Sequence, residues 1–114
     1  MKIMVSSFSE TSNAMANPRF GRSDWLILFD IENKTEQVFP NPASNQSGGA
    51  GVAAAQFVVD QKVDVVISGH FGPNAASVLS TAGIQMILFS DEQQTCQQLV
   101  SAFQQGELKE FIHA

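Results

Sequence analysis

The chain has 114 residues, of which 44% are hydrophobic and only 15% charged, and its formal net charge is −5. This length suits one compact domain, residues 1–114. The excess of acidic residues argues against binding to nucleic acid or to an anionic membrane surface, because both are bound mainly through Lys and Arg side chains. One cysteine excludes an intrachain disulfide, and no stretch resembles a signal peptide or the roughly 20 apolar residues of a membrane span, so we expect a cytoplasmic protein.

The first part of the chain predicts one strand, one long loop and one hairpin. Residues 3–8 are apolar enough for a strand, whereas the polar stretch 9–24 contains a proline and a glycine that oppose regular structure. Residues 25–31 and 35–39 flank a short polar turn, which is typical of an antiparallel hairpin. A loop as long as 9–24 is usually functional or disordered in a compact domain.

The second part predicts alternating helices and strands. A helix that is apolar over most of its circumference runs from Gly51, and a second helix covers 73–82 with proline in its first turn. Residues 63–68 and 84–89 are short continuous apolar runs, as expected for buried strands.

A last helix precedes the C-terminal residues. We expect it to begin at Ser90, because Ser90 and Gln93 have the spacing of a capping box, and to end at Gly106. Cys96 lies on its apolar stripe and is interpreted as a core residue. Residues 107–114 are expected to add a short turn.

The order of these elements predicts an α/β sandwich with a mixed sheet. Helical crossovers imply parallel neighbouring strands, whereas the hairpin must be antiparallel. In such sheets ligands bind beyond the carboxyl ends of the parallel strands. The loop 9–24 and the turn that follows 63–68 should both emerge at that edge.

Both arginines of the chain lie in one short segment of the long loop, Pro18-Arg19-Phe20-Gly21-Arg22. Guanidinium groups are forked donors that stay charged at physiological pH, so their concentration in an acidic protein predicts an anionic target. The alternative is a solvated pair that contacts Asp24 or Glu10. We include Phe20 and Gly21 in the candidate binding segment.

Two glycine-rich turns lead into helices and are suited to the same anion. The first contains Ser47, Gly48, Gly49 and Gly51, and its small residues allow a ligand to approach the backbone. Unpaired N–H groups and the helix dipole favour anions at such a helix start. The alternative is a plain tight loop, and the glycine spacing fits neither a Walker loop nor a dinucleotide fingerprint.

The second turn carries His70, Phe71, Gly72 and Asn74, which we also include in the candidate cofactor-binding set. A neutral His70 can ligate a metal, and a protonated one can bind an anion. The alternative is a histidine whose nitrogens are satisfied by backbone carbonyls. Phe71 is interpreted as a packing residue or a wall of the site.

Four short motifs, in this order, resemble the dinitrogenase iron-molybdenum cofactor biosynthesis family: residues 18–22, Asn41-Pro42, residues 48–51 and residues 72–75. The similarity spans nearly the whole chain. It implies a three-layer ribonuclease H-like fold, in which a five-stranded mixed sheet has the order 3-2-1-4-5, the second strand is antiparallel to the others, and helices cover both faces.

The resemblance also implies a function. Members of the family bind or carry the iron-molybdenum cofactor or its iron-sulfur precursor, and some relatives hold a molybdenum-copper sulfide cluster noncovalently. It therefore implies a noncatalytic carrier of an anionic metal-sulfur cluster, accessory to nitrogen fixation or to another pathway, with cluster-assembly or acceptor proteins as partners. Backbone N–H groups and arginines can hold such a cluster without thiolate ligands.

Two other functions remain open. The same loops would suit a small binding module for phosphate-bearing metabolites or nucleotides. A ribonuclease H-like fold can also host a two-metal nuclease, but this needs carboxylates at the sheet centre, where the first strand offers Met4 and Ser6. No sequence motif indicates a catalytic residue, so we expect no enzymatic activity.

Overall fold

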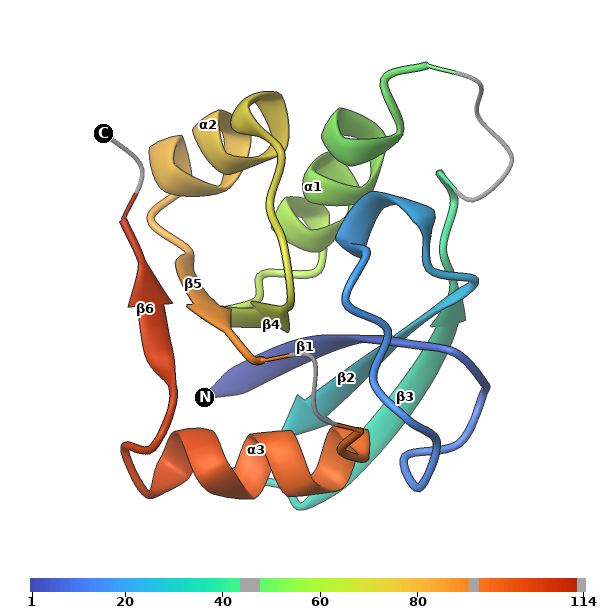
Figure 1. Cartoon of the computed structure of the whole chain (residues 1–114), viewed down its shortest axis with the longest axis vertical. Coiled ribbons are helices and arrows are strands. Elements are labelled where there is room, and N and C mark those ends of the chain that lie inside the picture. Colours follow the sequence, from blue (N-terminus) through green and yellow to red (C-terminus); the bar gives the residue numbers. More distant parts are fainter. Residues whose placement is uncertain (44–47, 91–92, 113–114) are drawn as a thin grey trace.

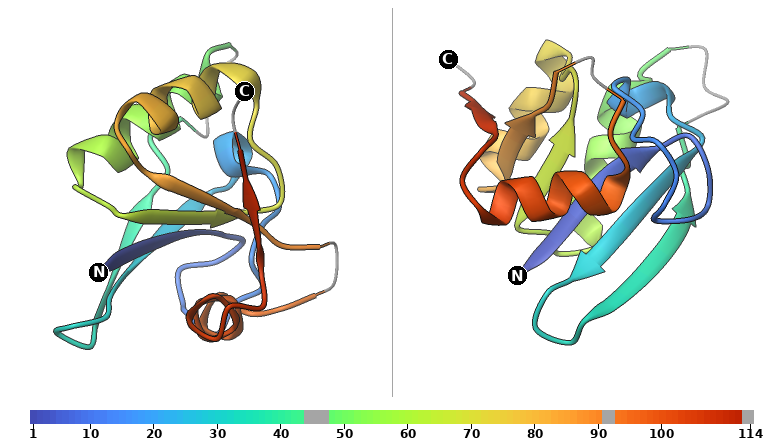
Figure 2. Two further views of the ribbon diagram at one scale, coloured as in Figure 1. Left: turned by 90° about the vertical axis from the view of Figure 1, so that its left-hand side faces the viewer. Right: turned by 60° about the horizontal axis from the view of Figure 1, so that its bottom comes forward.

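A mixed β-sheet with helices on both faces forms the body of the molecule. The computed structural model describes residues 1–43, 48–90 and 93–112. Two helices, α1 and α2, lie side by side on one face of the sheet, and α3 crosses the other face (Figures 1 and 2). The layers agree with the predicted helix–sheet–helix arrangement.

The elements follow the expected order, with one additional strand. The strands are β1 (Lys2–Ser7), β2 (Trp25–Asp30), β3 (Thr35–Pro40), β4 (Val65–Ser68), β5 (Gln85–Leu88) and β6 (Lys109–Phe111); the helices are the 3-10 turn η1 (Phe20–Arg22), α1 (Ala50–Asp60), α2 (Pro73–Thr81) and α3 (Cys96–Gln104).

The sheet has the order β3-β2-β1-β4-β5-β6. β1, β4 and β5 are parallel neighbours, and β2 is antiparallel to both β1 and β3. The predicted order of the first five strands and the antiparallel second strand are therefore confirmed.

The prediction of five strands is wrong, because β6 pairs antiparallel with β5. In place of the expected short turn, residues 109–111 extend along this edge, and Phe111 lies opposite Met86. The ring of Phe111 packs on that of Phe71, with centroids 5.9 Å apart. This contact between segments distant in sequence stabilises a strand too short to be recognised from its own pattern.

Two hydrophobic clusters fill the space on either side of the sheet. Met4, on β1, points toward α1 and α2, whereas its neighbours Ile3 and Val5 belong to the cluster under α3. This alternation is what a strand buried on both faces requires. Small residues such as Ala54 and Ala76, both fully buried, allow α1 and α2 to pack closely.

The last helix begins later than predicted. Its N-cap is Thr95, whose Oγ1 accepts a hydrogen bond from the Gln98 backbone N–H at 3.1 Å, while Gln98 Oε1 accepts one from the Thr95 N–H at 2.8 Å. The capping box predicted at Ser90 and Gln93 is therefore wrong. Both pairs fit the same local pattern, and the choice between them depends on contacts elsewhere in the chain.

Those contacts come from the long loop. The Ala16 N–H donates to the Gln94 carbonyl at 2.9 Å, and Met15 forms a β-bridge with Thr95. The long loop therefore pairs with Gln94 and Thr95, immediately before the first residue of α3. Cys96 is fully buried, as predicted, and burial raises the pKa of its thiol, so the group is a neutral part of the core.

Candidate functional site

The long loop returns to the carboxyl ends of β1 and β4, where it lies against the turn that follows β4. Arg19 forms a parallel β-bridge with His70. The Pro18 carbonyl accepts hydrogen bonds from the Gly69 N–H at 3.2 Å and from Ser68 Oγ at 3.3 Å. Two segments that are about fifty residues apart in the chain are therefore joined directly at the edge predicted for ligand binding.

Gly69 is required by this junction. A Cβ atom added there would lie 2.5 Å from Pro18 Cβ and 2.9 Å from Pro18 Cα, which is closer than real atoms approach. The absence of a side chain lets the two backbones run side by side. Gly69 therefore has a packing role, which was not predicted from its position in the sequence next to the candidate ligand residues.

Buried serines anchor the loop from below. Ser6, on β1, donates through Oγ to the Asn17 carbonyl at 2.6 Å, and its Oγ lies 3.0 Å from Ser68 Oγ. Both serines are fully buried. The Asn17 side chain accepts a hydrogen bond from the Arg19 N–H at 2.9 Å and so shapes the chain immediately before the arginine.

The role of these buried polar side chains was not predicted from the sequence. Its detectable signal was a polar residue at the end of each of two apolar strands, where β1 finishes in Ser6 and Ser7 and β4 finishes in Ser68. These groups hold the site in place, and they occupy the strand ends where a two-metal enzyme would need carboxylates.

The turn η1 packs against the start of α1. A Cβ atom on Gly21 would lie 3.0 Å from both the Cα and the N of Gly51, so the two backbones touch. Phe20 is 2% exposed, and its ring packs on that of Phe71 with centroids 5.6 Å apart. The structure thus brings together all three segments singled out in the sequence.

Asn41 fixes η1 from the other side. Its Nδ2 donates to the Phe20 carbonyl and to Ser23 Oγ, both at 3.2 Å, and its Oδ1 accepts from the Ala43 N–H. Asn41 is 3% exposed. Asn41 of the Asn-Pro dipeptide noted in the sequence therefore supports the site and is shielded from solvent, whereas Pro42 is exposed.

The candidate side chains divide into exposed and buried groups. Phe20 and Phe71 are buried and form a floor, which agrees with the packing role expected for Phe71. Gly21, Gly51 and Gly72 are partly exposed, and Ser47 lies outside the described residues. The exposed members, which are accessible to a ligand, are Arg19, Arg22, Gly48, Gly49, His70 and Asn74.

The two helices that begin at the site lack side-chain caps. The N-cap of α1 is Gly49, in the left-handed conformation with φ 70°, and the N-cap of α2 is Gly72, followed by Pro73. Neither N-cap residue provides a side-chain hydrogen bond. Helix starts of this kind leave N–H groups and the positive end of the helix dipole available to an anion.

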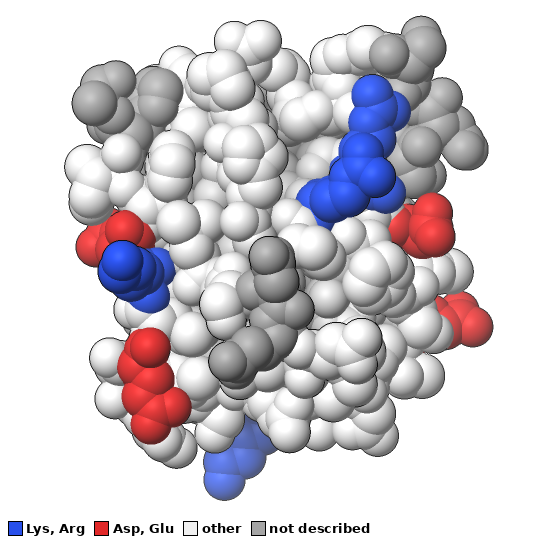
Figure 3. Space-filling model, viewed as in Figure 1, with Lys and Arg blue, Asp and Glu red and all other residues white. Residues whose placement is uncertain are grey.

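A positively charged patch lies over η1 on one face of the molecule (Figure 3). The turn places Arg22 and its N-cap Arg19 there. Most of the surface around this patch is uncharged, and the acidic groups in this view lie toward the left and right sides of the molecule. Because the whole chain is acidic, this local potential favours an anion at the junction of the loops.

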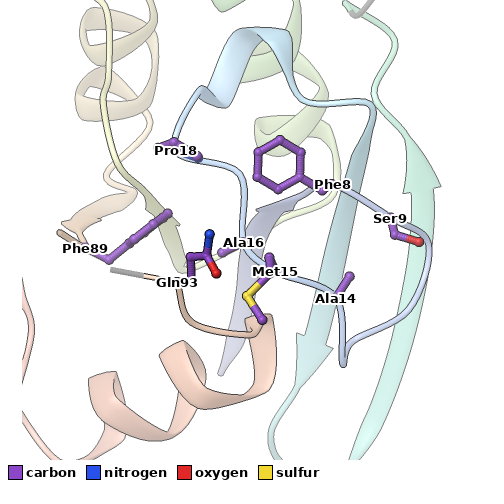
Figure 4. Close-up of a pocket in the computed structure, with 8 residues that line it drawn as sticks. All are labelled: Phe8, Ser9, Ala14, Met15, Ala16, Pro18, Phe89 and Gln93. Atoms are coloured by element: carbon purple, nitrogen blue, oxygen red, sulfur yellow. The ribbon is translucent and has the colours of Figure 1, made fainter. Parts of the chain in front are cut away.

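An apolar cavity of about 580 Å³ lies on the other side of Pro18 (Figure 4). Its walls include Phe8, Met15, Ala16 and Phe89, and its polar lining residues are Ser9 and Gln93. The sequence analysis did not identify this cavity. The available signal was the apolar run Ala14-Met15-Ala16 within the loop 9–24.

The described residues contain no group of three or more His, Cys, Asp and Glu side chains that could hold a metal ion. The prediction that His70 ligates a metal stays a prediction. In the same part of the chain, none of the helices has the length and apolar character needed to span a membrane.

The fold and the site define a small α/β domain that gathers arginines and uncapped helix starts at one edge of a mixed sheet. The sequence model of the dinitrogenase iron-molybdenum cofactor family matches residues 1–106. The chain belongs to this family.

Similar proteins come from bacteria and archaea. The apo form of the orange protein from Desulfovibrio gigas superposes with a TM-score of 0.91 at 27% identity, covering 98% of this chain and 93% of that one. TM1290, a candidate NifB protein from Thermotoga, gives a TM-score of 0.82 at 28% identity, with coverages of 96% and 91%. MJ0580, an uncharacterized protein of Methanocaldococcus jannaschii, is 28% identical over 102 residues, which are 87% of this chain and 85% of its own.

Proposed function

We propose that this protein binds an anionic metal-sulfur cluster noncovalently and carries it, without catalysing a reaction, as part of iron-molybdenum or related cofactor biosynthesis. The cargo would be the iron-molybdenum cofactor, its iron-sulfur precursor or a similar molybdenum-sulfur cluster. Membership of the iron-molybdenum cofactor family supports this class of cargo. We also retain the ribonuclease H-like classification as part of the proposal.

The observation that carries the proposal is the convergence of three segments on one exposed edge. The Arg19–His70 bridge joins the long loop to the turn after β4, and the Gly21–Gly51 contact joins it to the start of α1. Exposed arginine side chains and backbone N–H groups then lie at the same edge, where one ligand can contact both. Charge-assisted hydrogen bonds of this kind are about twice as strong as neutral ones, which suits a sulfide-rich anion.

His70 is assigned to the rim of this site. It is exposed and lies beside Arg19, so it can donate a hydrogen bond to the same anion as the arginine. The neutral thiol Cys96 is buried in the core and is not assigned to the cluster. Retention without thiolate ligands is therefore part of the proposal.

The test is an anaerobic titration of the protein with a preformed metal-sulfur cluster, followed by desalting and measurement of the retained absorbance and metal. We expect stoichiometric retention that is weakened by added salt, because the contacts are electrostatic. Absence of retention at high protein concentration would end the proposal. Partner proteins would be sought by measuring transfer of the retained cluster to cofactor-assembly or acceptor proteins.

The phosphate-binding alternative makes a contrasting prediction. A thermal shift with nucleotides or sugar phosphates, and none with clusters, would favour it over the carrier function. A two-metal nuclease needs clustered metal-binding side chains. The described residues contain no group of three or more His, Cys, Asp and Glu side chains that could hold a metal ion, so we do not propose the nuclease alternative.

A further inference from the structure

The apolar cavity beside the cationic edge is lined mainly by a part of the loop that is hydrogen-bonded to neighbouring segments. Phe8 is 56% exposed and Met15 is 41% exposed, although both are large apolar residues. The Phe8 N–H donates to the Met15 carbonyl at 3.1 Å, and Met15 is bridged to Thr95. The fold thus holds two apolar side chains at the surface, where they line a cavity (Figure 4).

This cavity shares a wall with the proposed anion site. Pro18 lines it, and the next residue, Arg19, bridges His70 at the cationic edge. None of the cavity-lining residues in the described part of the chain is charged. A ligand that reaches across Pro18 therefore meets guanidinium groups on one side and aromatic and thioether groups on the other.

We propose that the cavity receives the sulfido face of the bound anion and makes the protein select sulfido over oxo anions; this inference rests on the proposed cluster-binding function. A sulfido ligand is large, polarizable and weakly hydrated, so it loses little on leaving water and gains contact with Phe rings and the Met15 thioether. An oxo ligand binds water strongly and loses those hydrogen bonds in an apolar cavity. Phe8, Met15 and Phe89 are the residues that set this selectivity.

Tetrathiomolybdate and molybdate provide a matched pair of probes, because both are tetrahedral dianions. We would measure their affinities for the full-length protein by anaerobic calorimetry. We expect the wild type to bind tetrathiomolybdate about ten-fold more tightly than molybdate. Met15→Gln and Phe8→Gln should each reduce this ratio about three-fold, because they replace apolar contact by a hydrated amide.

Two controls separate the cavity from the cationic edge. Val38→Gln alters an apolar residue on β3 that is 38% exposed, close to the value for Met15, and should leave the ratio unchanged. Arg19→Gln should weaken both anions together and preserve their ratio, since it removes charge without changing the cavity. Thermal unfolding of each variant checks that these exposed substitutions leave the fold intact.

The outcomes distinguish the inference from the function on which it rests. Equal wild-type affinities for the two anions would overturn the selectivity and leave cluster binding standing. The wild type could prefer tetrathiomolybdate while Met15→Gln, Phe8→Gln and Val38→Gln all leave the affinity ratio unchanged. That outcome would overturn the assignment of the selectivity to the cavity. Binding of neither probe, together with no retention of a preformed cluster, would overturn both proposals.

Discussion

The three α-helices in the described part of the chain begin in two different ways. α3 begins with a complete capping box, in which Thr95 and Gln98 satisfy each other's backbone N–H groups. α1 and α2 begin with Gly49 and Gly72, which provide no side-chain cap. The first N–H groups of α3 are thus paired, by the capping box and by the Ala14 and Ser12 carbonyls of the long loop. The starts of α1 and α2, at the edge where the arginines lie, have no side-chain cap and can offer N–H donors to an anion. In the proposed function, the difference separates a helix that serves stability from two helices whose starts also contact the anion.

The largest expected effect is on the junction that places the arginine loop next to α2. Gly69→Ala puts a Cβ atom 2.5 Å from Pro18 Cβ, so the free energy of unfolding should fall by about 2–3 kcal/mol. Urea denaturation would measure it. Gly48→Ala is the matched control, because nothing lies within 4 Å of the added atom, and a similar loss there would contradict the packing argument.

Removing an arginine tests the binding edge directly. Arg22→Ala should reduce retention of a metal-sulfur cluster about ten-fold, the loss of one charge-assisted contact of roughly 1.4 kcal/mol. The measurement is the retained absorbance after anaerobic desalting. Cys96→Ala is the comparison, because the buried thiol has no assigned contact with the cluster, and equal losses in the two variants would count against the role of the arginines.

A change at the N-cap of α3 should lower stability and leave cluster retention unchanged. Thr95→Ala removes the side-chain acceptor for the Gln98 N–H and should lower the free energy of unfolding by about 1 kcal/mol. Cluster retention by the folded variant should stay at the wild-type level. A clear loss of retention by the folded variant would contradict the contrast between the helix starts, because it would show that the start of α3 also contributes to binding.

The smallest expected change in stability comes from adding a side-chain cap to α2, and this variant tests the contrast between the helix starts directly. Gly72→Ser places a capping hydroxyl at the start of α2, where φ is −66° and nothing lies within 4 Å of an added Cβ. Stability should change by no more than a few tenths of a kcal/mol, because Ser and Gly are both accepted N-caps. Cluster retention should nevertheless fall, since the hydroxyl occupies an N–H group that the anion would use. Unchanged retention, measured alongside unfolding, would remove α2 from the site.

Local sequence patterns failed where two segments satisfied the same rule. Ser90 with Gln93 and Thr95 with Gln98 both fit a capping box, and the structure uses the second because the long loop pairs with Gln94 and Thr95. β6 was missed for a related reason. Its three residues carry too little pattern, and their position depends on the edge of β5 and on the ring of Phe71.

The parts of the candidate site that lie within one short segment of the sequence could be predicted. Two arginines in one short segment and glycines before two helices are visible in the sequence, and the family resemblance came from the same motifs. The buried polar supports and the apolar cavity were not visible. Ser6, Asn17 and Ser68 acquire their roles only when the ends of β1 and β4 meet the loop.

By itself, the sequence determined the first five strands, the three helical segments and the places where charge and glycine are concentrated, because hydrophobic period, proline and glycine act over a few residues. The strand β6 and the exact start of α3 depended on contacts with distant segments. Tertiary structure alone decided that Arg19 lies beside His70, that Gly21 touches Gly51, and that Phe8, Met15 and Phe89 enclose one cavity. Those contacts join segments separated by tens of residues. Their energies come from close packing between elements, which depends on the complete fold and not on neighbouring residues.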